Sequence, residues 1–448
     1  MNSVATPVVS SIADLLTAPL QATYPKEVTD AARMCFVDWC GVALGAIGEL
    51  PGTIAARAMQ DEGRAPVLSG GKMSAPIAAL VNGTLAHTLD FDDTHVPSLT
   101  HISGATWAAI VALSATPGRE DADILDAFIK GFEVGGRLGR GIGPAMLERG
   151  LHATATIASL AATAAGCALL QLDRNQIMNA MGLAATQAGG LTISFGTMAK
   201  PFHAGKAAMN AVIAVQMALH GFEASLEAFD SPEGLARAVV QDRTLAFRPV
   251  DDLSWQVLLN TFKPYASCLL THPSVDCARS LAQMIGPTPV QKISARVHPL
   301  AIRLAGKTRP STPLEGKFSL SYCIALAFAG YPVSAANFTA QFLRDETLAR
   351  LTSRVTLEPD ERLRETAARM TVTLDDGSER EAEIDFARGN PENPMQWSDM
   401  EAKFIGLTEN RLGAAQAKAL FDELRKMQRA ADLSVLSAVP DSRCSAFN

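Results

Sequence analysis

The first 260 residues contain one helix-forming segment after another, and many of these segments consist mainly of alanine and other small apolar residues. Alanine has the highest helix propensity, and small side chains let neighbouring helices pack closely. A helix that is apolar on most faces must be covered on most sides. The pattern therefore predicts a large helical bundle. The expected helices span residues 26–46, 75–89, 106–114, 121–138, 154–170, 174–182 and 206–220.

The pattern changes after about Pro264. Residues 292–298 and 355–357 alternate between polar and apolar side chains, as strands with one buried face do. Residues 370–384 form two alternating runs around Asp376-Gly377, a dipeptide that favours a tight hairpin. This part of the chain is therefore expected to contain a small sheet.

The length of 448 residues requires more than one domain, because a single hydrophobic core rarely grows beyond roughly 250–300 residues. An amphipathic helical pattern returns at residues 398–430, after the strand-rich part. We therefore expect a mainly α fold, in which a large all-helical domain carries an inserted, smaller α+β lid domain. The expected ranges are 1–265 for the first part of the helical domain, 266–394 for the lid domain and 395–448 for the C-terminal return to the helical domain.

Composition excludes several classes of protein. The formal net charge is −7 and no long run of lysine or arginine occurs, so a nucleic-acid partner is not expected. The seven cysteines form no CxxC pair, which argues against a disulfide framework and against a zinc or iron–sulfur site. The N-terminal residues lack the pattern of a signal peptide, and apolar stretches such as 158–170 are shorter than a membrane span needs. We therefore expect a cytoplasmic protein without a membrane partner.

The most polar segment among the apolar helices is NGTLAHTLDFDDTHVPSLTH, at residues 82–101. If the helix continues to Thr94, then His87, Asp90 and Thr94 lie on one face, because they are spaced by three and four residues. His101 follows on a short loop. An imidazole, a carboxylate and a hydroxyl that project together can orient a substrate and tune a histidine. The alternative is that these polar residues cap or decorate a helix end.

Four further polar blocks interrupt the apolar sequence. His152 precedes an alanine-rich helix, at a helix N-terminus where backbone N–H groups favour anions. Lys200 lies in KPFHAGK, where burial would lower the pKa of its ammonium group. Taken singly, each block is also consistent with ordinary turn, linker or core chemistry. The chemically useful residues of the four blocks are His152, Lys200, His203, Lys263, His272 and Tyr322.

Taken together, the five blocks resemble the MmgE/PrpD family, which contains 2-methylcitrate dehydratase, cis-aconitate decarboxylase and iminodisuccinate epimerase. The resemblance covers nearly the whole chain and is strongest in NGTLAHTLDFDDTH at 82–95, followed by THISGA at 100–105. The supporting motifs are GLHATAT at 150–156, KPFHAGKAA at 200–208, KPYASCLLTHPSVD at 263–276, GKFSLSY at 316–322 and GNPENPM at 389–395.

The resemblance implies a helical domain capped by an α+β lid, a homodimer, and an active site between the two domains. It also implies a small anionic polycarboxylate as substrate, with no metal and no organic cofactor. Between Thr94 and His101 the chain is one residue longer than in the decarboxylase branch. The matching motifs imply functional roles for Asp90, Thr94, His101, His152, Lys200 and Tyr322, and Lys263 and His272 fall at positions where the family varies.

The three activities share one chemical demand, since each removes or delivers a proton at a carbon next to a carboxylate. Negative charge develops on the substrate and needs electrostatic stabilisation. We expect His101 to be the leading general acid/base, oriented by Asp90 and Thr94. In the remaining assignments Lys200 and His152 bind carboxylates and stabilise charge, Tyr322 is a second proton carrier from the lid, and His87, Thr94, His203, Lys263 and His272 contact the substrate.

The substrate is predicted from one further similarity. GTMAKPFHAGKAA at 196–208 is closer to the short epimerase-like branch, so an epimerase of the iminodisuccinate type is the main prediction. The alternative is a lyase of the 2-methylcitrate dehydratase or cis-aconitate decarboxylase type. A Mg²⁺-dependent prenyl-diphosphate enzyme is a remote alternative, because Asp92-Asp93 lacks the second acidic residue three positions beyond the pair. A non-catalytic helical scaffold would show repeats of roughly 20–50 residues, and none is visible.

Overall fold

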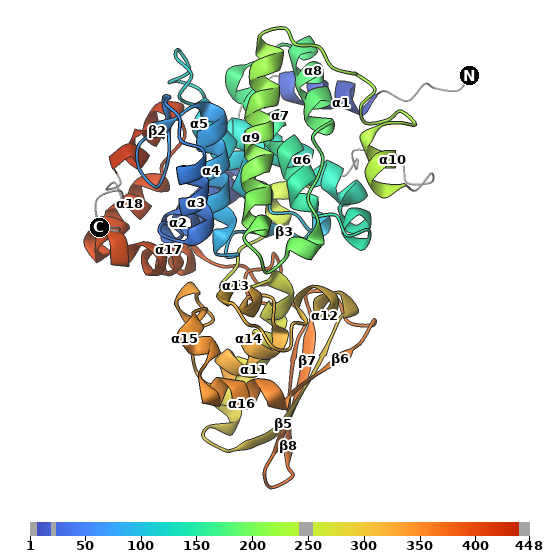
Figure 1. The fold of residues 1–448 in the computed structure, drawn as a ribbon, viewed down its shortest axis with the longest axis vertical. Coiled ribbons are helices and arrows are strands. Elements are labelled where there is room, and N and C mark those ends of the chain that lie inside the picture. The colour runs from blue at the N-terminus through green and yellow to red at the C-terminus, as the bar shows by residue number, and fades with distance from the viewer. Residues whose placement is uncertain (1–6, 19–23, 242–253, 439–448) are drawn as a thin grey trace.

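The computed structural model describes residues 7–18, 24–241 and 254–438. A helical domain carries α1 and α18, and a smaller domain with the sheet lies below it in Figure 1. The prediction of a mainly α fold with an α+β lid is confirmed. Cys444 and the first six residues, on which the absence of a signal peptide was partly argued, lie outside the described residues.

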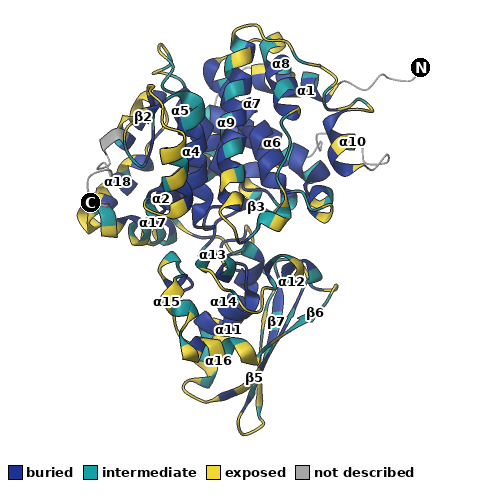
Figure 2. Cartoon of the chain, viewed as in Figure 1, coloured by how far each residue is buried: buried dark blue, intermediate teal, exposed yellow. Residues whose placement is uncertain are grey.

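The core of the helical domain is a set of buried, alanine-rich helices that pack on one another. Figure 2 shows this core as the densest group of buried residues. Among the residues that the structure describes, α7 is the one helix with the length and hydropathy of a membrane span, and 94% of that span is buried inside the domain. Helices α2 and α3 pass the same test only as a pair bent by 83°. The central helices are α4 (Ala75–Thr88), α5 (Ile102–Leu113), α6 (Ile124–Glu148), α7 (Ala153–Leu170) and α9 (Ala199–Leu219).

The remaining elements of this domain surround the core. They are α1 (Val8–Thr17), α2 (Lys26–Gly45), α3 (Leu50–Ala58), α8 (Arg174–Ala185) and α10 (Leu235–Val240), with the short strands β1 (Ala65–Pro66), β2 (Lys72–Met73), β3 (Thr94–His95) and β4 (Asn260–Thr261) and the 3₁₀ turns Val96–Ser98, Thr192–Ser194 and Gln256–Leu259.

Helices α4 and α9 approach each other at two glycines. A Cβ atom added at Gly205 would lie 2.2 Å from Thr84 Oγ1 and 2.3 Å from Leu80 O, and one added at Gly83 would lie 2.9 Å from the Gly205 Cα. The two backbones are therefore in contact, as the small residues in these helices predict. This contact sets the distance between the ends of α4 and α9, which carry polar residues of the site.

Two helix boundaries differ most from the prediction, the start of α9 and the end of α6. Helix α9 begins at Ala199, seven residues before the expected start, so Lys200 and His203 are helical. Pro201 does not prevent this, because a proline in the first turn of a helix removes no intrahelical hydrogen bond. Helix α6 continues through its glycine-rich stretch to Glu148, since those glycines allow close approach to Ser98 and other neighbours.

The lid is built on a four-stranded sheet in the order β6-β5-β7-β8. Strand β5 pairs parallel with β6 and antiparallel with β7, and β7 forms the predicted hairpin with β8 around Asp376-Gly377. Alternate residues of β7 are buried beneath α11, as its alternating pattern requires. The strands are β5 (Val290–Val297), β6 (Val355–Pro359), β7 (Ala368–Leu374) and β8 (Glu379–Ile384), and the helices are α11 (His272–Ile285), α12 (Pro299–Ala305), α13 (Pro313–Gly316), α14 (Leu320–Phe328), α15 (Ala340–Leu343) and α16 (Glu346–Arg354), with 3₁₀ turns at Leu269–Thr271 and Ala335–Asn337.

After the lid the chain returns to the helical domain. Helix α17 (Trp397–Leu412) packs against α2 and α18 (Ala414–Leu424), and the 3₁₀ segment Ala430–Ala438 follows. The helical domain is therefore completed by residues from both ends of the described chain, as expected from the returning amphipathic pattern. The boundaries at 265 and 394 stay predictions.

Candidate active site

A cavity of about 70 Å³ lies between the helical domain and the lid. Half of its lining is apolar and half is polar or ionisable. Six of the predicted site residues line it, so the chain brings these distant motifs to one place. The polar lining residues are Asp90, Thr94, His101, His152, Lys200, Lys263 and Cys268, and the apolar ones are Leu99, Leu147, Phe195, Leu269, Leu270, Leu304 and Phe318.

Two buried lysines converge on one carboxylate in this cavity. Lys200 Nζ lies 2.6 Å from Asp90 Oδ1, and Lys263 Nζ lies 3.5 Å from the same oxygen. Lys263 also donates to the Asp90 backbone carbonyl at 2.9 Å. Burial opposes ionisation of Asp90, but the two ammonium groups lower its pKa below the usual range. Two positive charges therefore face one negative charge, and the surplus is available to an anionic ligand.

The polar cluster forms through a turn and not through helical spacing. Helix α4 ends at Thr88, and Asp90 adopts a left-handed conformation with φ of 50°. Thr94 already belongs to β3, which pairs with β4 at the domain junction. The expectation of a helix continuing to Thr94 is therefore wrong, because the chain reverses at Asp90, where Lys200 and Lys263 hold it.

The carboxylate that orients the histidines is Asp92. Its Oδ2 lies 2.8 Å from His87 Nδ1 and 3.1 Å from His101 Nδ1. The expected orienting groups contribute less: Thr94 Oγ1 lies 3.4 Å from His101 Nδ1, and Asp90 binds the lysines. The assignment of Asp90 and Thr94 as the orienting pair is therefore corrected to Asp92.

This arrangement leaves one ring nitrogen of His101 for chemistry. Its Nδ1 faces Asp92, so its Nε2 is the nitrogen available to a ligand in the cavity. His87 differs, because its Nε2 lies 2.8 Å from Lys200 Nζ and accepts that hydrogen bond. His87 therefore connects Asp92 to Lys200 and is absent from the cavity lining, although the sequence predicted contact with substrate.

Burial determines the charge state of these histidines. It lowers the pKa of His101, an effect that Asp92 opposes, and it lowers the pKa of His87 to about 3. Asp92 has the opposite behaviour: burial raises its pKa, but the two histidines outweigh this and lower the pKa well below the usual range. In the free protein at neutral pH the site therefore holds neutral imidazoles beside an ionised carboxylate. A bound anion would raise the pKa of His101.

His152 reaches the cavity from the N-terminus of α7, as predicted. Its Nδ1 lies 3.0 Å from His203 Nδ1, so one of the two rings donates to the other. Burial and then Lys200 lower the pKa of His152 well below its usual range. His203 therefore supports His152 from behind and does not line the cavity.

Two predicted residues of the lid side lie elsewhere. The Tyr322 hydroxyl donates to Asn337 O at 3.3 Å, and its ring packs against Phe338 inside the lid. His272 is buried, and its Nε2 lies 3.2 Å from Ser267 O. Neither side chain lines the cavity: Tyr322 packs inside the lid, and His272 is buried against Tyr265 and Ser267. The expectation that they reach the substrate is corrected accordingly.

The lid contributes other groups instead. Phe318 lines the cavity, with its ring centroid 5.5 Å from Lys200 Nζ, and Phe195 packs on the same ammonium group at the same distance. Lys317 donates to Leu89 O at 2.5 Å, just before the turn at Asp90. Burial lowers the pKa of Lys317 to about 8, with Asp90 opposing. The lid therefore contributes the Phe318 ring to the cavity lining, and Lys317 binds the backbone beside the turn at Asp90 without lining the cavity.

In the described part of the chain, one group of side chains could offer ligands to a metal ion. The ligand atoms of His87, Asp92 and His101 lie within 4.8 Å of one another. The same two Nδ1 atoms already face Asp92 Oδ2 at hydrogen-bond distances. Binding of an ion would have to replace both of these hydrogen bonds. The geometry therefore fits the hydrogen-bonded triad better than a metal centre.

Several contributors escaped the sequence analysis. Asp92 and Asp93 stood inside the quoted motif NGTLAHTLDFDDTH, but neither was assigned a role in the site. Lys317 and Phe318 stood in the quoted motif GKFSLSY beside Tyr322, and the buried cation was a usable signal. The leucines that line the cavity have no distinctive sequence pattern, so only the structure identifies them as part of the site.

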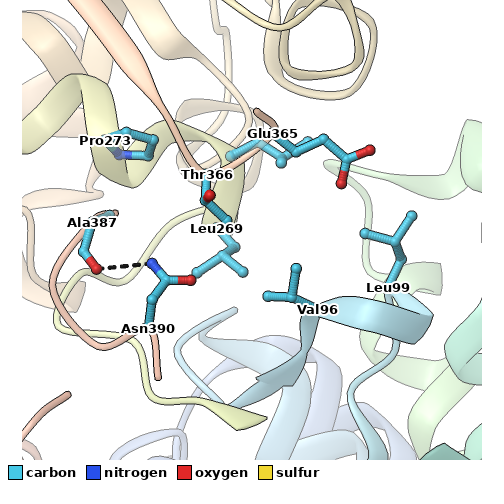
Figure 3. A pocket seen from close by; sticks show the side chains of 9 residues that line it. Val96, Leu99, Leu269, Pro273, Glu365, Thr366, Ala387 and Asn390 are labelled. Atoms are coloured by element: carbon cyan, nitrogen blue, oxygen red, sulfur yellow. Dashed lines mark hydrogen bonds between the residues drawn. The ribbon is translucent and has the colours of Figure 1, made fainter. Parts of the chain in front are cut away.

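A second, smaller hollow adjoins the cavity at the domain junction (Figure 3). It shares Leu99, Leu269 and Leu270 with the cavity, so these leucines form the wall between the two spaces. In Figure 3 Val96 and Leu99 approach from the helical domain and face Leu269 and Glu365. The apolar side of the cavity is therefore made jointly by both domains.

Comparison with known proteins adds two kinds of similarity. Residues 10–248 match the MmgE/PrpD N-terminal domain, and residues 265–427 match the MmgE/PrpD C-terminal domain. The chain is also similar to cis-aconitate decarboxylase from Homo sapiens, with 26% identity over 382 residues that cover 81% of this chain and 78% of the relative. A cis-aconitate decarboxylase from Aspergillus terreus is 24% identical over 456 residues, covering 92% of this chain and 91% of the relative.

Proposed function

The chain belongs to the MmgE/PrpD family, and from this premise we propose that it is a lyase that decarboxylates an unsaturated tricarboxylate of the cis-aconitate type. The names of its curated relatives support this reaction more than the epimerase predicted from residues 196–208. The observation that carries the proposal is the pair of buried lysines beside the Asp92–His101 dyad.

The charge and polarity of the cavity support a substrate of this kind. Lys200 and Lys263 share the carboxylate of Asp90, so these three side chains together carry a small surplus of positive charge. Seven of the fourteen lining residues are apolar, including Leu269 and Phe318. A carbon–carbon double bond can lie against such a wall, whereas the four carboxylates of iminodisuccinate would find few partners there.

The proposed reaction needs one proton on carbon. In cis-aconitate the double bond lies at the β,γ position relative to the carboxylate of the CH₂ arm. As CO₂ leaves, the electron pair of the broken C–C bond forms the new terminal double bond. The electron pair of the old double bond moves to the CH carbon, which takes a proton. Lys200 and Lys263 would hold the other carboxylates through charge-assisted hydrogen bonds.

His101 is the proposed proton donor. The substrate anion raises the pKa of His101 on binding, and Asp92 stabilises the resulting imidazolium through Nδ1. The proton then leaves from Nε2, the nitrogen available in the cavity. His152 lies on the same lining and would stabilise charge on a second carboxylate.

One experiment distinguishes the activities within the family. The protein is incubated in D₂O with cis-aconitate, 2-methylcitrate or iminodisuccinate, and the products are followed by ¹H NMR. We expect CO₂ loss from cis-aconitate with one deuterium on the product carbon. Inactivity toward cis-aconitate, with water loss from methylcitrate or α-proton exchange in iminodisuccinate, would overturn the proposal in favour of the dehydratase or the epimerase.

We also propose that the protein is a homodimer that pairs through the outer face of α9. Apolar side chains are exposed along this helix and the loop before it: Ile193 is 84% exposed, Phe202 42% and Met217 40%. Large exposed apolar patches mark interfaces, and we propose that these side chains contribute to one. Analytical ultracentrifugation should show a dimer that Met217→Lys weakens, whereas the matched change Met284→Lys in the lid leaves it intact. A wild-type monomer would contradict the proposal.

A further inference from the structure

A buried ion pair lies directly behind the turn that carries Asp92. Lys403 comes from α17 in the C-terminal return, and Asp38 comes from α2. Lys403 Nζ lies 2.6 Å from Asp38 Oδ1, with side-chain exposures of 4% and 1%. Neither residue lines the cavity, so neither touches a substrate there.

The ion pair holds the backbone on both sides of Asp92. Lys403 Nζ donates to Phe91 O at 2.7 Å and lies 4.0 Å from the centre of the Phe91 ring. Asp38 Oδ2 accepts from the Asp93 backbone N–H at 3.1 Å. The peptide units before and after Asp92 are therefore each fixed by one member of the pair.

The carboxylate after Asp92 is held by different groups. Asp93 Oδ2 accepts from Ser103 Oγ at 2.6 Å and from Asn260 Nδ2 at 2.8 Å. Asn260 belongs to β4 at the domain junction, and Ser103 belongs to α5. The segment from Phe91 to Asp93 is therefore fixed at three points, and Asp92 is the only one of its carboxylates that points to the histidines.

We propose that Lys403 and Asp38 are positioning residues that aim Asp92 at His101. The inference rests on the proposed function for its substrate, but its geometry concerns the free protein. A buried ion pair gives little net stability, since desolvation offsets the attraction and apolar replacements of similar size are often equally stable. The use of such a pair at this turn is explained by the two backbone hydrogen bonds that it makes.

Kinetics of four variants provide the first test. Lys403→Met and the double variant Asp38→Leu/Lys403→Met are compared with Lys418→Met, a change at an exposed lysine on the neighbouring helix α18. A misplacement of about 1 Å at a catalytic group can lower the rate about 100-fold. We expect both Lys403 variants to lose about this factor in kcat on cis-aconitate with little change in KM, and Lys418→Met to keep both constants. Asp38→Leu alone should resemble Lys403→Met.

The double variant separates positioning from stability. Removal of both charges should recover the unfolding midpoint that either single variant loses, because no unpaired charge remains buried. If kcat stays low while the midpoint recovers, positioning is supported. If kcat recovers together with the midpoint, the pair acts only on stability and the proposal is overturned.

A spectroscopic measurement needs no substrate. In protein labelled with ¹⁵N-histidine, the ring N–H protons that His87 and His101 donate to Asp92 should give far-downfield signals. We expect Lys403→Met to remove or shift them and Lys418→Met to leave them unchanged. Unchanged signals in Lys403→Met would overturn the proposal, even if the protein proves inactive on cis-aconitate and the proposed function itself fails.

Discussion

Replacement of Gly205 by alanine tests whether the contact between α4 and α9 sets the geometry of the site. A methyl group there would lie 2.3 Å from the Leu80 backbone oxygen, whereas ordinary van der Waals contacts begin at 3.4 Å. Because this oxygen belongs to the backbone of α4, it cannot move without the helix. The two helices must therefore separate by about 1 Å. Overpacking of this kind lowers the free energy of unfolding by roughly 1–3 kcal/mol.

The separation acts directly on the catalytic groups. Lys200 precedes Gly205 by five residues on α9, and His87 follows the facing Gly83 by four residues on α4. The 2.8 Å contact between Lys200 Nζ and His87 Nε2 spans the gap between these helices, and a shift of about 1 Å would break it. We expect a loss of about 100-fold in kcat/KM, the size that misplacement of this order can produce.

The assay combines urea unfolding with steady-state kinetics for Gly205→Ala and a control. Gly406 in α17 has open space around its Cα, so Gly406→Ala should raise stability by up to about 1 kcal/mol and leave turnover unchanged. Wild-type stability and turnover in Gly205→Ala would refute the reasoning, because the helices would then tolerate the methyl group without moving.

Four further outcomes are expected. His101→Ala and Asp92→Asn should each lower kcat roughly 10²–10⁴-fold while the fold persists. Tyr322→Phe should keep near-normal turnover, because its hydroxyl faces Asn337. Turnover should survive EDTA, because the candidate ligand atoms already form hydrogen bonds. The free energy of unfolding should fall as the pH drops below about 6.5, because burial lowers the pKa of His272 to about 3 and the unfolded chain then binds the extra proton.

Each outcome has a measurement that can contradict it. At pH 5 one such histidine lowers the free energy of unfolding by about 2 kcal/mol. The free energy of unfolding of His272→Asn, measured with urea, should therefore depend less on pH than that of the wild type. An equal slope in both proteins would rule out His272 as a contributor. A large loss of turnover in Tyr322→Phe would support the prediction that Tyr322 carries a proton. Loss of activity with EDTA that Mg²⁺ or Zn²⁺ restores would favour a metal centre.

The sequence predicted those features that depend on local chemistry. Periodicity identified α2, α4 and α7 to within a few residues, because buried alanine-rich helices have a strong and regular pattern. The hairpin around Asp376-Gly377 followed from its turn residues. Five polar motifs were also identified as parts of one site. Boundaries such as the start of α9 were less accurate, since Pro201 and the glycines near it are compatible with either a loop or a first helical turn.

The sequence by itself determined the residue types of the site, namely lysines, histidines and aspartates on apolar helices. Only the tertiary structure decided their partners. Asp90 binds lysines from α9 and from the domain junction, Asp92 orients His101, and Tyr322 turns into the lid. The reason is physical: these contacts join residues that are up to 173 positions apart, and the turn at Asp90 breaks the helical periodicity on which a prediction from spacing depends.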